Sequence, residues 1–153
     1  MQTTILLFVY GTLRKGCVND ISRKYRNVTF KGTATIPGAL YELEGLPYPG
    51  VSLSNNQHTV TGEVYETDET ILNYLDEFEG YDPDNEKNSF YFRKEITIVL
   101  DGAEVNCFIY EINKGKFRIG RIIGSGDWKQ FIEHDPSVLK RKENWPVNLK
   151  DTP

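Results

Sequence analysis

The sequence predicts a single α+β domain, a small and mostly antiparallel β-barrel with one or two flanking helices. Three observations lead to this class. Short apolar or alternating segments recur along the chain between glycine, proline and acidic turn residues. Only residues 68–79 have a strong helical period. Strands and helices do not alternate regularly, which argues against a doubly wound parallel sheet.

The size and composition of the chain fit this class. Its 153 residues favour one domain with its own core, and we expect residues 1–134 to form it and residues 135–153 to form a loosely packed C-terminal tail. The net charge of −4 argues against nucleic acid as the main partner. Two cysteines make no disulfide framework, and the first apolar run is too short for a signal peptide or a membrane span. We therefore expect a cytoplasmic protein without membrane contacts.

The first half of the chain is expected to be mainly β-structure. A short apolar run predicts the first strand at residues 4–10. Alternating or β-branched segments predict further strands at 28–36, 39–43, 51–53 and 58–66. Gly62 interrupts the last of these, which indicates a bulge or a close backbone contact at that position.

One helix is predicted over residues 68–79. Asp68 has the side chain of an N-cap, and Gly80 has the residue type that ends helices in the left-handed conformation. An apolar stripe runs along one side of the helix and consists of Ile71, Leu72, Leu75 and Phe78. The helix is therefore expected to pack on the sheet through this stripe.

A β-hairpin follows the helix. Asp101-Gly102 is a strong two-residue turn signal, and it joins predicted strands at 90–100 and 103–112. The glycine-rich segment 113–126 is predicted to be a loop, and residues 127–134 a short helix capped by Asp127.

The end of the first strand carries a candidate anion-binding loop. Tyr10, Gly11, Thr12 and Leu13 follow the apolar run and lead to Gly16, and Gly11 allows bare backbone N–H groups to approach a ligand. The segment matches neither GxxxxGK[ST] nor GxGxxG, so a nucleotide is weakly supported and a carboxylate fits as well. The alternative is a strand-end turn without a ligand.

Glu79 is the candidate general acid or base. The negative end of the helix dipole, together with the like charge of Asp76 three residues earlier, is expected to raise its pKa toward neutrality. The alternative is that Glu79 is an ordinary acid that ends a helix.

Tyr91 and Arg93 lie two residues apart in a predicted strand and share a face, so they are expected either to line a pocket or to form an exposed polar face. His58 and His134 have no ligand-spaced companions, so no metal site is predicted.

Three motifs in this order resemble the γ-glutamylcyclotransferase-like family: Tyr10-Gly11-Thr12-Leu13, Phe78-Glu79-Gly80, and Tyr91 followed by Arg93. Gly62-Glu63-Val64-Tyr65 resembles the strand that precedes the helix in that family. The resemblance implies a small barrel-like fold and cleavage of a small-molecule γ-glutamyl amide with release of 5-oxoproline, without metal or cofactor.

The resemblance also implies roles for individual residues. Tyr10 to Leu13 would form the substrate cradle, and Glu79 would be the catalytic acid/base. Tyr91 would bind the substrate or orient Glu79, and Arg93 would pair with a carboxylate of the substrate or form a structural ion pair.

Two other functions stay open on this scaffold: removal of a γ-glutamyl group from a larger amine, and a non-catalytic binding or interaction domain. The loop between Gly80 and Tyr91 is long enough to form a lid or to reshape the leaving-group side. A monomer or a homodimer is expected.

Overall fold

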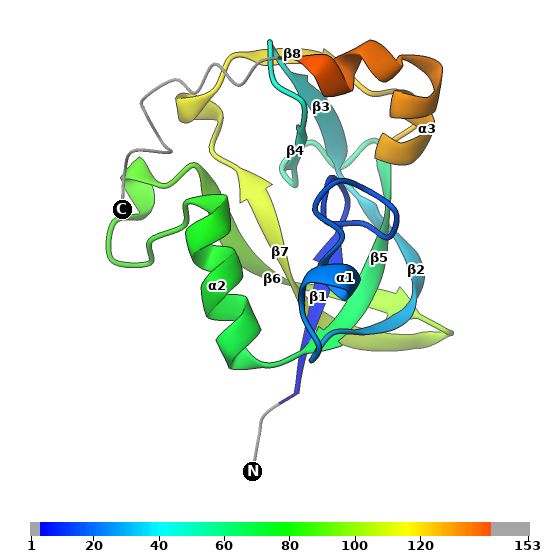
Figure 1. Ribbon diagram of the computed structural model, residues 1–153, viewed down its shortest axis with the longest axis vertical. Helices are drawn as coiled ribbons and strands as arrows, with labels where there is room; N and C mark the ends of the chain where they lie inside the picture. The colour runs from blue at the N-terminus through cyan, green and yellow to red at the C-terminus, as the bar shows by residue number, and fades with distance from the viewer. Residues whose placement is uncertain (1–3, 142–153) are drawn as a thin grey trace.

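The computed structural model describes residues 4–141 and consists of two β-sheets with helices packed around them (Figure 1). The five-stranded sheet has the order β2 (Thr29–Pro37), β5 (Thr59–Thr67), β1 (Ile5–Val9), β7 (Ala103–Ile112) and β6 (Tyr91–Leu100). The three-stranded sheet has the order β4 (Pro49–Ser52), β3 (Ala39–Leu43) and β8 (Ile119–Ile122). Neighbouring strands are antiparallel except β1 and β7, which are parallel.

The helices are short apart from α2. The α-helices are α1 (Ile21–Lys24), α2 (Glu69–Glu79) and α3 (Trp128–His134), and the 3-10 turns are η1 (Glu86–Asn88), η2 (Lys114–Lys116) and η3 (Pro136–Lys140). The predicted ends of α2 are confirmed, because Asp68 accepts a hydrogen bond from the Ile71 N–H and Gly80 has φ 68°. Within residues 4–141, no helix has the length and apolarity that crossing a membrane requires.

The α+β class is confirmed, but the expected barrel is not closed. The edge strands β2 and β6 approach each other so closely that a Cβ on Gly32 would lie 3.1 Å from Leu100 Cδ1. No hydrogen-bonded ladder joins these two strands in the described part of the chain. Packing of side chains, and not strand pairing, therefore fills the space between the two edges.

Strand β1 lies in the middle of the five-stranded sheet and is buried on both faces. Leu7 and Val9 belong to the apolar cluster that also contains Leu72 and Leu75 of α2. Phe8 belongs to the second cluster, on the opposite face. The loop that follows β1 therefore starts at the centre of the molecule, and α2 lies beside the sheet near it (Figure 1).

The hairpin prediction is confirmed. Asp101 and Gly102 both have positive φ, 52° and 81°, as a two-residue turn with right-handed strand twist requires. The turn pairs Leu100 with Ala103 and fixes the register of β6 on β7 over ten residue pairs.

The prediction of a loop over residues 113–126 is wrong, because β8 lies within it and adds a strand to the second sheet. The strand has only four residues, two of them exposed. A Cβ on Gly120 would lie 3.0 Å from the Glu42 carbonyl oxygen, so glycine here allows close strand contact and does not mark a turn.

Two smaller expectations also differ from the structure. Phe78 is 45% exposed and does not join the core beneath α2, and Lys24 lies with its ammonium 4.9 Å from the ring centroid. Residues 135–141 do not pack loosely: Val138 is fully buried, and Arg141 donates to Glu42. The rest of the expected tail lies outside the described residues.

The close contact predicted at Gly62 can be tested by substitution. A Cβ there would lie 2.3 Å from the Val9 carbonyl oxygen and 2.5 Å from Phe8 Cζ. Gly62→Ala should destabilise the protein by about 3 kcal/mol, since neither backbone nor buried ring can move freely. Urea denaturation measures the change. Gly124→Ala is the control, because its Cβ would meet nothing within 4 Å; equal stability of both variants would contradict the prediction.

Candidate active site

A cavity of about 950 Å³ opens between the end of β1, the C-terminal end of α2 and the loop over residues 81–90. Six of the seven residues predicted for the site line it: Tyr10, Gly11, Thr12, Leu13, Glu79 and Tyr91. Arg93, the seventh, is not among the lining residues. The fold thus brings together three segments that are far apart in the chain, at Tyr10 to Leu13, at Glu79 and at Tyr91.

In residues 11–13 the backbone carbonyl groups accept hydrogen bonds, whereas the backbone N–H groups have no acceptor among the described residues. The Gly11, Thr12 and Leu13 carbonyl oxygens accept hydrogen bonds from the N–H groups of Arg14, Asn19 and Ile21, respectively. Within residues 4–141, no acceptor receives the N–H groups of residues 11–13. Three neighbouring donors are therefore free for a ligand, as in backbone sites that bind anions.

Gly11 lies close to the ring of Pro49. A Cβ at this position would lie 3.0 Å from both Cδ and Cγ of the Pro49 ring. Pro49, the first residue of β4, therefore lies against the bare backbone at the start of the segment that carries the free N–H groups.

Glu79 is the last residue of α2, and its half-buried side chain lines the cavity. Among the described residues its carboxylate has no hydrogen-bond or ion-pair partner. Burial raises the pKa of Glu79 to about 8. The expected high pKa is present, but its cause is loss of hydration and not the charge of Asp76.

The negative charge of Asp76 is neutralised by an ion pair with Arg93. Its carboxylate accepts hydrogen bonds from Arg93 Nη1 at 2.5 Å and from the Tyr110 hydroxyl at 2.7 Å. Arg93 also lies over the rings of Tyr81 and Phe108, 5.5 and 5.1 Å from their centroids. Of the two roles left open for Arg93, the structure thus contains the ion pair, which holds the last turns of α2 against β6 and β7.

Three tyrosines, Tyr10, Tyr91 and Tyr110, line the cavity together with Glu79 and donate their hydroxyls to other groups. Tyr10 donates its hydroxyl to the Tyr110 carbonyl oxygen at 2.7 Å, and Tyr91 donates to the Pro49 carbonyl oxygen at 2.9 Å. Burial is the largest cause that raises the pKa of the Tyr10, Tyr91 and Tyr110 hydroxyls, and the negative charge of Glu79 acts in the same direction on all three. They stay protonated near neutral pH and shape the cavity wall.

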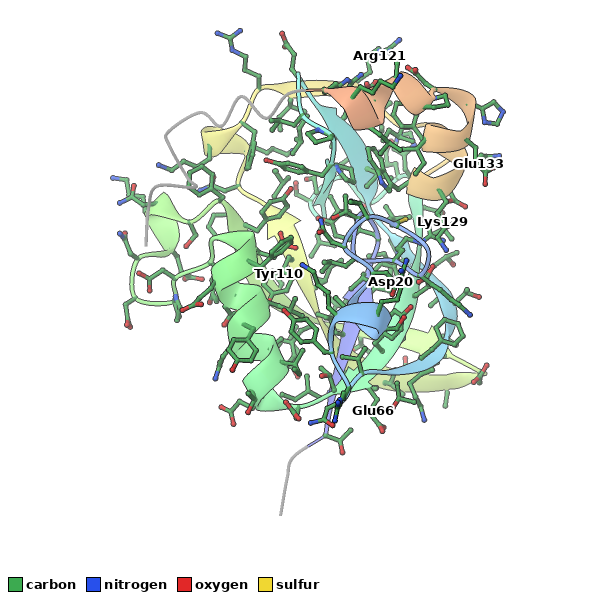
Figure 2. All side chains as sticks on the ribbon, in the orientation of Figure 1. Asp20, Glu66, Tyr110, Arg121, Lys129 and Glu133 are labelled. Atoms are coloured by element: carbon green, nitrogen blue, oxygen red, sulfur yellow. The ribbon has the colours of Figure 1, made fainter. Side chains whose placement is uncertain are left out.

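Tyr110 is a lining residue that the sequence reasoning missed. Figure 2 labels it beside α2, on β7. The hairpin register gives a signal that could have found it, because a turn at Asp101-Gly102 places Tyr110 directly opposite Arg93. Tyr48 and Pro49 also line the cavity, and no pattern in the sequence points to them.

The loop over residues 81–90 forms one wall of the cavity. Its two ends are joined by the hydrogen bond from the Phe90 N–H to the Gly80 carbonyl oxygen, 2.9 Å long. The buried Ser89 hydroxyl accepts from the Asp82 N–H, and its single hydrogen is shared between the carbonyl oxygens of Asp82 and Asn85. Of the two roles expected for this loop, the structure contains the wall that shapes the cavity.

The described part of the chain contains no group of three His, Cys, Asp or Glu side chains arranged to hold a metal ion. Cys17 and Cys107 are both free thiols.

Comparison with known proteins agrees with this geometry. The family described as gamma-glutamyl cyclotransferase, AIG2-like, matches residues 7–130, a range that includes every residue placed in the site above. The chain belongs to this family. The family consists of enzymes of the cyclotransferase type, so the resemblance carried by the three motifs is confirmed.

Curated relatives cover most of the chain. Gamma-L-glutamyl-butirosin B gamma-glutamyl cyclotransferase of Niallia circulans is 32% identical over 94% of this chain and 87% of its own length. Gamma-glutamylaminecyclotransferase of Bos taurus is 36% identical over 68% of this chain and 63% of its own length.

Solved structures share the fold. YkqA from Bacillus subtilis superposes with a TM-score of 0.67 and 28% identity. The match covers 88% of this chain but only 43% of YkqA, so this chain spans less than half of that protein. An AIG2-like protein from Mus musculus has a TM-score of 0.56 at 28% identity, over 71% of this chain and 76% of its own.

The raised pKa of Glu79 predicts a pH-dependent stability. Between about pH 4.5 and pH 8 the folded protein holds a proton on Glu79 that the unfolded chain has lost. The free energy of unfolding should therefore fall as pH rises through this window, by up to about 1.4 kcal/mol per pH unit from this group.

Urea denaturation of wild type and Glu79→Gln from pH 5 to pH 9 isolates the effect. The stability difference should shift in favour of the variant up to about pH 8 and then level off. Glu133→Gln, an exposed substitution on α3, is the control with a flat difference. A flat difference for Glu79→Gln as well would show that its pKa is ordinary.

Proposed function

We propose that the protein is a cyclotransferase that cleaves a small-molecule γ-glutamyl amide through intramolecular attack of the substrate's α-amine, releasing 5-oxoproline and a free amine. One observation carries the proposal. An unpaired carboxylate with a pKa of about 8, Glu79, lines the same cavity as the three unused N–H groups of Gly11, Thr12 and Leu13.

The cavity fits a substrate with both an anionic and a cationic end. Among its described lining residues there is no lysine or arginine, so a carboxylate must be bound by neutral donors. The free N–H groups of residues 11–13 would hold the α-carboxylate of the γ-glutamyl group. The α-ammonium group, one carbon away, would then lie toward Glu79.

Glu79 would move the protons. Its carboxylate takes one proton from the α-ammonium group, and the neutral amine attacks the γ-carbonyl carbon to form the new C–N bond. The tetrahedral intermediate collapses when protonated Glu79 donates to the nitrogen of the leaving amine and the old C–N bond breaks. The second proton of the ring nitrogen passes to the released amine, so two protons leave one nitrogen and two reach the other.

Beyond these proton transfers, the reaction needs mainly that the protein position the substrate. Attack within one molecule has a high effective concentration, and the main task is to hold the chain in the conformer that closes the five-membered ring. The tyrosine hydroxyls beside Glu79 are committed to other acceptors, so the carboxylate stays available to the substrate.

The size of the cavity bears on the leaving group. A volume of about 950 Å³ is at the upper end of small-molecule sites, and the γ-glutamyl group occupies only part of it. This room favours a substantial leaving amine, which keeps removal of the group from a larger amine as the second candidate. We expect the protein to act in the cytoplasm, as a monomer or homodimer.

The central test is release of 5-oxoproline from a panel of γ-glutamyl amides with small, large, neutral and charged amines. Glu79→Gln keeps the shape of the side chain but cannot take a proton, so kcat should fall by about 10³-fold. Glu133→Gln should retain wild-type activity. If Glu79→Gln releases 5-oxoproline as fast as wild type, the assignment of the base is wrong; if no amide is a substrate, a binding role replaces the enzyme.

The pH dependence of the reaction gives an independent check. Because Glu79 must be ionised to accept the proton, kcat/KM should rise with pH and level off above about pH 8. Initial rates from pH 6 to pH 9.5 on the best amide of the panel measure this. A plateau that already begins near pH 5 would assign the base to a carboxylate with an ordinary pKa.

A further inference from the structure

A second carboxylate, Glu63, lies behind the loop that carries the free N–H groups. It belongs to β5, directly after Gly62, and its side chain is only 3% exposed. Its Oε1 accepts from the Lys15 N–H at 2.7 Å and from the Tyr65 hydroxyl at 3.1 Å. Its Oε2 lies 2.8 Å from Arg14 Nε and 3.1 Å from Lys129 Nζ.

These contacts use the full capacity of the side chain. An ionised carboxylate has about four acceptor sites, and Glu63 receives four donors. Glutamine has one acceptor oxygen and would turn an NH₂ group toward donors. Burial acts to raise the pKa of Glu63, but the hydrogen bonds from Lys15, Arg14 and Lys129 outweigh it and lower the pKa.

The contacts join three parts of the fold at the loop. Glu63 on β5 pairs with Val9, the last residue of β1. It therefore lies beside the point where the loop begins. Two of its four donors, Arg14 and Lys15, follow the free N–H groups immediately in sequence. Arg14 is buried and also binds Asp127, the N-cap of α3, at 2.8 Å. Figure 2 labels Lys129 at this junction, on α3.

The free N–H groups are thus held between two fixed points. On one side Gly11 packs against Pro49, and on the other side Arg14 and Lys15 are bound by Glu63. Neither Glu63 nor Arg14 lines the cavity, so both act from behind the loop.

We propose that Glu63 is the positioning residue of the anion-binding loop: its buried carboxylate binds Arg14 and Lys15 and so holds the N–H groups of Gly11, Thr12 and Leu13 in the arrangement that binds the substrate's α-carboxylate. The inference rests on the proposed function only in the identity of the anion.

The test compares binding of 5-oxoproline with binding of 2-pyrrolidinone, which is the same ring without the carboxylate. ¹H–¹⁵N NMR titrations follow the amide signals of residues 11–13 in wild type and in Glu63→Gln. Wild type should prefer 5-oxoproline, and the variant should lose about tenfold of that preference, because its N–H groups are no longer held toward the carboxylate. Each titration reports on folded protein, so a smaller folded population lowers signal intensity and not the preference.

Each outcome either supports or overturns the positioning role of Glu63. Loss of preference in Glu63→Gln supports the positioning role even if no amide yields 5-oxoproline in the activity assay. An unchanged preference in the folded variant would overturn it. A wild type that binds both rings equally would also overturn it, because the loop would then not be a carboxylate site.

Two further variants keep the test decisive. Lys129→Met removes the partly exposed donor, leaves the Arg14 and Lys15 contacts in place, and should retain the wild-type preference within about twofold. If Glu63→Gln does not fold, Arg14→Lys replaces it. A single ammonium group cannot reproduce the separate contacts of Arg14 to Glu63 and Asp127, so the preference should fall in the same direction.

Discussion

The burial of β1 on both faces is the constraint from which the rest of the site follows. A strand in the middle of a sheet, with apolar neighbours above and below, cannot shift its register without exposing one set of side chains. Its end is therefore a fixed point in the molecule. The loop that starts there, the carboxylate of Glu63 beside it on β5, and the helix α2 on one face all take their positions from that strand.

The two carboxylates near the loop show how surroundings separate chemically identical groups. Glu63 receives four donors, so its charge is stabilised although it is buried. Glu79 has no such donors among the described residues, and burial disfavours its charge. The first therefore suits a fixed structural contact, and the second suits a group that gains and loses a proton. Asp76, one turn before Glu79, is held by Arg93 and Tyr110 and stays out of that chemistry.

The sequence predicted the features that depend on local signals. The caps of α2 at Asp68 and Gly80, and the turn at Asp101-Gly102, depend on a few neighbouring residues and were confirmed. The four-residue strand β8 was missed because its stability comes from pairing with a distant strand. Closure of the barrel was predicted incorrectly, since strand pairing at an edge depends on the whole curvature of the sheet.

The residues of the candidate site were predictable to a similar extent. Glu79 and the loop at Tyr10 to Leu13 could be named because a helix end and a strand end mark them in the sequence. The role of Arg93 stayed open because its partner Asp76 is 17 residues away. Tyr110 was missed although the hairpin register places it opposite Arg93. The burial that raises the pKa of Glu79 is a property of the assembled cavity, which no single segment encodes.

The absence of cationic side chains among the described residues of the cavity has a kinetic consequence. Peptide N–H groups attract an anion as dipoles, and the field of a dipole falls with distance more steeply than that of a charge. The chain carries a net charge of −4, so its overall field does not draw anions in from solution. Capture of a carboxylate would then depend on collision and fit at short range, and added salt would not slow it, because no long-range attraction is there to be screened.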